Sequence, residues 1–188
     1  MIKKYKIVYG GSVQESYQLN KNDLEKIVLF KNTQYNGFKY DFDILLPGYK
    51  INKKNFPQSL SVGKNINSNQ LILCFKDNNE IISILDIHLF NGFYQGKQTG
   101  QINYGWTDPN YTRQGLSKLL RISLIQLLKI LNIKYLISIP FKSAFSNPIL
   151  DYLEFGTDEE NPSIRFLDIS KVNVEEYSEK AILIIRKK

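Results

Sequence analysis

The stretch that decides the fold reads WTDPNYTRQGLSKLL and runs from Trp106 to Leu120. Strand composition ends at Asp108-Pro109, and a glycine at position 115 precedes a long apolar run. The first amides of a helix have no partner within the helix and lie at the positive end of its dipole, so they can bind phosphate. Glycine allows a close approach to the backbone there. The stretch therefore predicts a strand, a turn and a helix whose first turn can hold a diphosphate.

The residues before this stretch predict an antiparallel sheet. Strand composition marks residues 71–75, 80–90 and 101–107, with a hairpin signal at Asp77-Asn78-Asn79 and a glycine-bearing turn between residues 91 and 100. Alternation places Asp86 and His88 on one face of the second strand, and the odd-numbered residues 81–89 on the other. In the third strand, residues 102, 104 and 106 share a side.

The residues after it predict further helices and strands around a buried centre. Residues 111–132 form the strongest helix pattern, in which the polar positions, Arg121 among them, make a narrow stripe, and Asn132 is a plausible left-handed stop. The apolar run 133–139 is typical of a central strand. A helix over 147–156 and strands over 164–169 and 181–185 complete the chain.

The N-terminal part is less regular. A strand over residues 5–9 precedes a helix capped at Asn22-Asp23. Residues 36–69 carry glycines, prolines and aromatic side chains, and we expect a loop-rich or broken helical insertion there.

Composition indicates one globular domain over residues 1–188. The chain is 43% hydrophobic and 23% charged, which excludes a disordered, collagen-like or simple coiled-coil protein. One cysteine, Cys74, and one histidine offer neither a disulfide framework nor a metal-ligand cluster. No apolar run approaches the roughly 18 residues of a membrane span. We therefore expect a cytoplasmic protein without a metal and without membrane contact.

The charge of +7 invites a nucleic-acid interpretation. The basic residues are mostly lysine, however, and the chain is rich in Asn, Ile and Tyr and poor in Ala. Codons of an A/T-rich genome explain this bias, and no patch is as dense as a DNA-binding arm. We do not expect nucleic acid as a partner, whereas an anionic ligand stays open.

Two motifs resemble the GNAT superfamily of acyl-CoA N-acyltransferases. The window 112–117 resembles the family's Gln/Arg-x-x-Gly-x-Gly/Ala pattern between its fourth strand and third helix. It keeps Gly115 and has Thr112 and Ser117 at its ends. Tyr152-Leu-Glu-Phe-Gly156 resembles the family's Tyr-x-x-x-Gly at the end of the fourth helix, with Thr157 where Phe is usual. The resemblance implies an α/β fold with a mixed, mostly antiparallel central sheet flanked by helices on both faces.

The resemblance also implies direct transfer of an acetyl group from acetyl-CoA to a primary amine. Tyr152 would be the general acid that protonates the leaving thiolate. Backbone groups of Trp106 and Thr107, at the end of the family's fourth strand, would bind the pantetheine arm, and a backbone amide of that strand would meet the carbonyl's developing charge. The residues that would bind acetyl-CoA are Trp106, Thr107, Thr112, Arg113, Gln114, Gly115, Leu116, Ser117, Lys118 and Asn147.

The amine must lose a proton, and Asp86 and His88 are the best candidates for the base. The acidic runs 158–160 and 175–176 could attract a cationic amine, and the aromatic stretch 35–49 is where we expect recognition of the unidentified acceptor.

Each site residue also has a structural alternative. Gly115 can be an ordinary helix-start residue, Tyr152 a core-edge aromatic, and Asp86 and His88 satisfied buried groups. A non-catalytic module that binds CoA or another anion on the same fold is the rival hypothesis. The protein could be a monomer or a homodimer.

Overall fold

The structure, a computed structural model, describes residues 7–9, 12–50, 65–139 and 147–186, without the side chains of residues 7–9, 12–14 and 147. Its elements in chain order are β1 (Ile7–Tyr9), β2 (Ser12–Ser16), α1 (Lys21–Thr33), β3 (Asp41–Leu45), β4 (Gln70–Asp77), β5 (Glu80–Tyr94), β6 (Lys97–Thr107), a 3-10 turn (Pro109–Tyr111), α2 (Leu116–Ile130), β7 (Tyr135–Ser138), α3 (Asn147–Tyr152), β8 (Gly156–Thr157), β9 (Arg165–Asp168), a second 3-10 turn (Ile169–Lys171) and α4 (Val174–Arg186).

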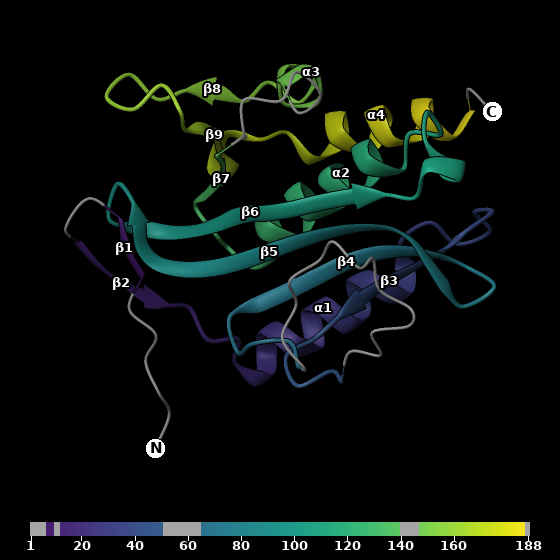
Figure 1. Ribbon diagram of the computed structural model, residues 1–188, viewed down its shortest axis with the longest axis horizontal. Helices are drawn as coiled ribbons and strands as arrows, with labels where there is room; N and C mark the ends of the chain where they lie inside the picture. The colour runs from purple at the N-terminus through teal and green to yellow at the C-terminus, as the bar shows by residue number, and fades with distance from the viewer. Residues whose placement is uncertain (1–6, 10–11, 51–64, 140–146, 187–188) are drawn as a thin grey trace.

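The strands form one sheet in the order β1-β2-β5-β6-β7-β9-β8, with β4 also paired to β5 and β3 to β4 (Figure 1). Among the strands that the structure describes, only β6 and β7 pair in parallel, and α2 is the connection between them. The predicted α/β fold with a mixed, mostly antiparallel sheet is confirmed.

The helices meet in one large core. Buried side chains of α1, α2, α3 and α4 share a cluster with Leu85, Ile87 and Leu89 of β5. Alternate residues of the same strands, such as Cys74 and Ile84, point to the opposite side, where a smaller cluster also takes in Leu45 and Ile66. The described residues of this smaller cluster come from strands and from the loop position 66.

A β-bulge in β6 changes which side chains share a face. Asp86 pairs with Tyr104, but the next residue, Ile87, pairs with Ile102, so Asn103 is the extra residue. Ile102 therefore packs in the large core, while Tyr104 and Trp106 pack in the small one. The prediction that residues 102, 104 and 106 share a side is wrong, because a bulge shifts the alternation by one position.

A shift in the pairing of β4 with β5, between Phe75 and Lys76, affects the start of β5 in the same way. Ile82, rather than Ile81, packs in the large core with Leu85.

The predicted helices over 111–132 and 147–156 are both shorter than expected. Pro109–Tyr111 forms a separate 3-10 turn, and α2 begins only after Gly115, whose φ is +80°. Asn132 has φ +57°, as a left-handed stop requires. α3 ends at Tyr152, Glu154 takes a positive φ of 63°, and Gly156 lies in β8.

The predicted strand over 181–185 is wrong, because these residues belong to helix α4. The Asn173 side chain accepts a hydrogen bond from the Glu175 N–H (3.1 Å) at the start of the helix. Tyr177 and Ala181 are buried four residues apart, which is the helical spacing. The apolar run 181–185 fits a strand only if the helix-start signal at Asn173 is not taken into account.

The N-terminal region differs from prediction in its cap and in two strands, β2 and β3, that the sequence did not predict. Asn20, two residues before the predicted cap, forms a capping box with Asp23 at the start of α1. β3 lies within the stretch predicted to be loop or broken helix, of which residues 51–64 lie outside the described residues. Tyr35, Phe38 and Phe42 pack their rings around Phe75. Much of the aromatic stretch 35–49 thus belongs to the core.

Candidate functional site

The turn before α2 has the backbone geometry of an anion-binding loop. Arg113 and Gly115 both have positive φ, 60° and 80°, and successive N–H groups in such turns form concave sites for anions. Gly115 is the N-cap, and no side-chain hydrogen bond caps the helix. The first amides of α2 are therefore not satisfied by a capping side chain, which leaves them suited to an external acceptor.

A cavity of about 470 Å³ lies beside this turn. The side chains or backbone of Arg113, Gln114, Gly115 and Lys118 form one part of its wall, and Tyr152 of α3 forms another. Leu183 and Ile184 of α4 complete the lining. The structure thus brings the predicted general acid to the predicted diphosphate loop, although β7 and α3 separate them in the sequence.

Two lysines flank Tyr152 in this cavity region. The Lys118 Nζ lies 4.4 Å from the centre of the Tyr152 ring, and the Lys180 Nζ lies 5.9 Å from it. Lys180 is also paired with Glu176 (3.0 Å) and Glu154 (3.5 Å). Lys118 and Lys180 thus place positive charge beside the ring of the candidate acid.

One side of Gly115 is covered by α4. A Cβ atom on Gly115 would lie 2.4 Å from Cγ2 of Ile184. The turn is therefore closed on the side of α4, and a ligand has access to it from the cavity lined by Arg113 and Lys118.

The Tyr40 side chain supports the turn before α2 through a hydrogen bond and a ring contact. Its hydroxyl donates a hydrogen bond to Oε1 of Gln114 (2.7 Å), and its ring packs edge-on against Tyr111. Tyr35 braces the first turns of α2 in the same way, through its hydroxyl and the carbonyl of Leu119 (3.2 Å). Sequence reasoning assigned this aromatic stretch to acceptor recognition and missed its role in supporting α2, because the contact joins residues more than 70 positions apart.

The far end of β6 has a free side in the described structure. The parallel pairing with β7 runs only from Thr99 to Ile102, and β6 continues to Thr107. Trp106 and Thr107 lie in this last part, where Ser83 donates a hydrogen bond to the Trp106 carbonyl (3.1 Å). An unpaired strand edge can accept an extended, amide-containing chain as if it were a further strand.

Asp86 and His88 lie on the opposite face of β5 from the large core. The Asp86 carboxylate is buried and accepts hydrogen bonds from Nε2 of Gln70 and Nδ2 of Asn103, both at 2.8 Å. Nε2 of His88 is buried 3.8 Å from Asp86, too far for a hydrogen bond, and has no hydrogen-bond partner among the described residues. Asp86 thus sits beside the β6 bulge, while Tyr152 packs against the large core on the other side.

Some predicted site residues lie apart from the cavity or are engaged elsewhere. The Thr112 hydroxyl bonds to the Pro109 carbonyl (3.0 Å). The Ser117 hydroxyl accepts from Nη1 of Arg121 (2.5 Å), and Leu116 is buried in the large core. Asn147 begins α3, but its side chain is outside the described part.

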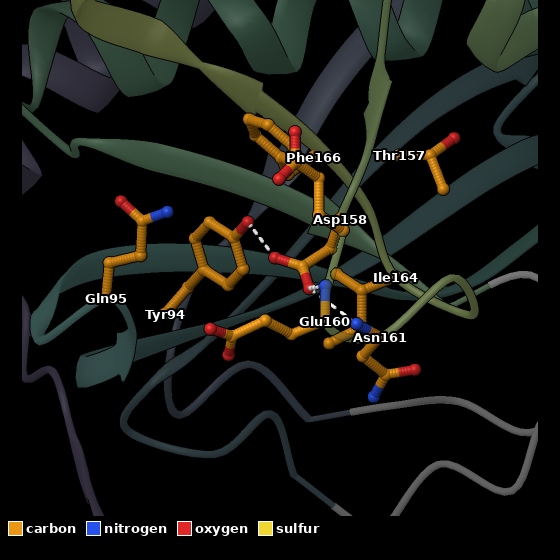
Figure 2. Close-up of a pocket in the computed structure, with 9 residues that line it drawn as sticks. Tyr94, Gln95, Thr157, Asp158, Glu160, Asn161, Ile164 and Phe166 are labelled. Carbon is orange, nitrogen blue, oxygen red and sulfur yellow. Dashed lines mark hydrogen bonds between the residues drawn. The ribbon is translucent and has the colours of Figure 1, made fainter.

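A second cavity, of about 600 Å³, is lined by the acidic run 158–160 (Figure 2). Figure 2 shows the Tyr94 hydroxyl pointing at Asp158, to which it donates a hydrogen bond that holds the pKa of this carboxyl below its usual range. Tyr94 lies at the start of the β5–β6 turn, whereas Arg113 follows the other end of β6. Since β6 has 11 residues, about 33 Å separates these ends. The acidic run is therefore not part of the cavity that contains Tyr152.

The described residues contain neither a metal-ligand cluster nor a membrane-crossing helix. No group of three or more metal-ligating His, Cys, Asp or Glu side chains occurs among them. None of the helices in the described ranges has the length and apolar character of a membrane-crossing segment.

No protein-family profile matches the sequence, and no curated protein matches it at the sequence level. Solved structures are similar in shape. The ribosomal-protein-S18-alanine N-acetyltransferase of Escherichia coli has 15% identity and a TM-score of 0.45, over 85% of this chain and 96% of that one. The PaiA N-acetyltransferase of Thermoplasma acidophilum, in complex with coenzyme A, has 14% identity and a TM-score of 0.44, over 53% and 61%. The KacTA–DNA complex has 12% identity and a TM-score of 0.49, over 68% of this chain and 78% of that one.

At these identities, neither activity nor partners are transferred from the similar structures to this chain. The topology is informative by itself. Strands β4, β5 and β6 form an antiparallel meander, and helix α2, which begins after Gly115, connects β6 to the parallel strand β7. Strand β9 pairs with β7 on one side and with β8 on the other. This order agrees with the family that the sequence motifs resemble, and the chain has a GNAT-like α/β fold.

Proposed function

We propose that the protein is an N-acyltransferase that moves an acyl group, acetyl in the simplest case, from a coenzyme A thioester to a primary amine. One observation carries the proposal. Tyr152, the candidate acid, lines the same cavity as Arg113, Gly115 and Lys118, the candidate diphosphate site. A donor with its diphosphate at one end of this region and its thioester beyond it would need both groups.

The turn and α2 bind the donor in this proposal. Arg113 and Lys118 supply positive charge, and the uncapped amides at the start of α2 supply hydrogen-bond donors. The amide-containing arm of the donor pairs with β6 beyond Ile102, where β7 no longer does. Fixing the thioester in this way supplies most of the catalysis, because the thioester is already activated.

The amine approaches from the face of Asp86. The lone pair of the amine nitrogen attacks the thioester carbonyl, so that an N–C bond forms and the C–S bond breaks. Asp86, or His88 next to it, takes the proton from the amine, and Tyr152 gives its proton to the departing thiolate. Asp86 and Tyr152 lie on opposite sides of the β5–β6 layer, so both can reach one thioester only if it lies beside β6 beyond Ile102, where β7 no longer pairs.

A non-catalytic anion-binding module is the second candidate. The contact between Ile184 and Gly115 favours it, because α4 reduces access to the turn. Such a module would bind coenzyme A or a similar diphosphate without releasing a thiol.

The decisive experiment measures binding and turnover separately in Tyr152→Phe. Calorimetry with acetyl-CoA reports donor binding, and release of free thiol against a panel of amines reports turnover. For an enzyme, we expect thiol release by the parent protein and about 10- to 1,000-fold less by the variant, with the dissociation constant within about twofold. Binding without thiol release by the parent protein supports the module, and no binding of either CoA or acetyl-CoA overturns both candidates.

A further inference from the structure

Arg121 is a buried cation that the site as described so far does not use. Only 8% of the residue is exposed, and burial lowers the pKa of its guanidinium to about 10. Nη1 donates to the carbonyl of Ser117 (3.1 Å) and to its hydroxyl, but Nε is buried without a hydrogen-bond partner in the described part of the chain. Buried charged groups are normally paired, because an unpaired one is strongly destabilising.

The chain itself offers no acidic side chain for Arg121. No ion pair to it occurs among the described residues, and desolvation alone accounts for its lowered pKa. The remaining residues, 1–6, 10–11, 51–64, 140–146 and 187–188, contain no Asp or Glu. A ligand is therefore the natural source of the missing negative charge.

The guanidinium lies against the part of β6 that has no β7 partner. A Cβ atom on Gly105 would lie 3.2 Å from Nη2 of Arg121, so the absent side chain at position 105 leaves the space in which the guanidinium sits. Gly105 is three residues beyond Ile102, the last residue of β6 paired with β7, and is itself exposed. The buried cation thus lies just beneath an open stretch of backbone.

This position separates Arg121 from the diphosphate site. Arg121 does not line the cavity of Arg113 and Lys118, and it lies six residues after Gly115, about 9 Å further along the helix. The arm of a coenzyme A thioester between its diphosphate and its acyl group is uncharged. The 3′-phosphate of coenzyme A lies beyond the diphosphate on the adenosine side, whereas Gly105, against which Arg121 lies, belongs to the part of β6 that pairs with the arm in the proposed function. An anion on this side of the diphosphate can therefore come only from the acyl group.

We infer that Arg121 is a specificity-determining residue that binds a terminal carboxylate on the acyl group of the donor. The inference rests on the proposed function and narrows its donor to thioesters of dicarboxylic acids. Arg121 would donate Nε–H and Nη2–H to the two carboxylate oxygens, the paired geometry that guanidinium and carboxylate favour. The transferred group would leave the amine with an amide that carries a free carboxylate.

Calorimetry with CoA, acetyl-CoA and succinyl-CoA tests this. We expect the parent protein to bind succinyl-CoA at least about 10-fold more tightly than acetyl-CoA, the effect of one charge-assisted pair. Arg121→Met should abolish the preference and leave acetyl-CoA binding within about threefold. Arg121→Lys, which keeps the charge but not the planar fork, should retain part of it. Lys97→Met, which removes one exposed positive charge at the start of β6, is the control and should keep it in full.

The melting temperature without ligand provides a readout that a structural role would not give. If Arg121 has no anionic partner until a ligand binds, Arg121→Met removes an unpaired buried charge. The melting temperature of the variant should then be about 2–4 °C higher than that of the parent protein. A lower melting temperature together with an unchanged donor preference would make Arg121 a brace for Ser117 and overturn the inference. Should Arg121→Met fail to fold, the donor preference of Arg121→Lys decides.

The remaining outcomes separate this inference from the proposed function. Binding of CoA and acetyl-CoA with no tighter binding of succinyl-CoA overturns the inference alone. Failure of all three compounds to bind overturns the proposed function and the inference with it. If acetyl-CoA is used but carboxylate-bearing amines are preferred in an Arg121-dependent manner, the anion belongs to the acceptor and the assignment to the donor is wrong.

Discussion

Cγ2 of Ile184 lies against the bare Cα of Gly115, 2.4 Å from the position that a Cβ would take. The contact joins the half-buried last turns of α4 to the first turn of α2. It gives Gly115 two structural reasons to be glycine, its positive φ and this close approach, in addition to any role in binding phosphate.

Gly115→Ala should therefore destabilise the fold through two separable effects. We expect a loss of about 1 kcal/mol from the positive φ and a further loss of about 1 kcal/mol from the Ile184 contact, both measured as the free energy of unfolding in urea. Gly96→Ala is the matched control, since Gly96 has φ +67° and no atom within 4 Å of its Cβ position. The second loss should disappear in the Ile184→Ala background. A cycle with no coupling between the two positions would contradict the packing described.

Tyr40→Phe should weaken donor binding without removing any group that faces the cavity. The ring stays packed, but Gln114 loses the 2.7 Å hydrogen bond that holds the turn. We expect a loss of about 1 kcal/mol of stability and a dissociation constant for acetyl-CoA raised about 3- to 10-fold. Tyr17→Phe is the control: it loses the hydrogen bond to Asp23 (2.9 Å), neither residue lines the cavity, and the variant should lose only stability. Equal effects of both variants on acetyl-CoA would speak against a positioning role.

Much of the fold follows from short-range patterns. The strand composition of β4, the alternation in β5, the turn at Asn78 and Asn79, and the apolar run of α2 are all local, and the structure contains each of these elements. The run 181–185 resembles a strand because its five consecutive apolar residues fit either element, and the cap at Asn173 together with the packing of Ala181 in the large core favours the helix.

The site was only partly accessible from sequence for a related reason. The motifs around Gly115 and Tyr152 could be read locally, and they do line one cavity. The burial of Arg121, the support from Tyr40 and the cover by Ile184 all depend on residues far apart in the chain. The bulge at Asn103 changes the facing of every later side chain in β6, and nothing in the strand composition marks it.

Asp43 should make stability dependent on acid pH. Its carboxylate contacts Lys31 (2.9 Å) and Lys76 (2.5 Å). Burial alone would raise its pKa, but the hydrogen bonds from the two lysines outweigh burial and the pKa is lowered. A carboxyl whose pKa is lower in the folded state contributes stability above its unfolded pKa of about 3.9, and this contribution is lost as the pH falls through the folded value.

We expect Asp43→Asn to reduce the free energy of unfolding by about 1–2 kcal/mol at pH 7, with a smaller difference from the parent protein below about pH 4. Asp41→Asn, an exposed position on the same strand, is the control and should change stability little at either pH. A difference between parent and Asp43→Asn that stays constant from pH 7 to pH 3 would show that the two lysines do not stabilise the ionised form.

Lys118 connects donor binding to the acid, and its replacement should affect both in distinguishable ways. Lys118→Met removes a positive charge from the cavity wall and the cation above the Tyr152 ring. We expect the dissociation constant of CoA to rise about 10-fold at low salt, with less dependence on salt than in the parent protein, because one charge fewer faces the diphosphate. Thiol release at saturating donor should fall as well, since the Tyr152 phenolate loses its nearest cation.

Two controls accompany Lys118→Met. Lys118→Arg, which keeps the charge, should restore binding of CoA, and Lys97→Met should change neither the dissociation constant of CoA nor thiol release. An unchanged dissociation constant in Lys118→Met would place the diphosphate elsewhere than at the start of α2.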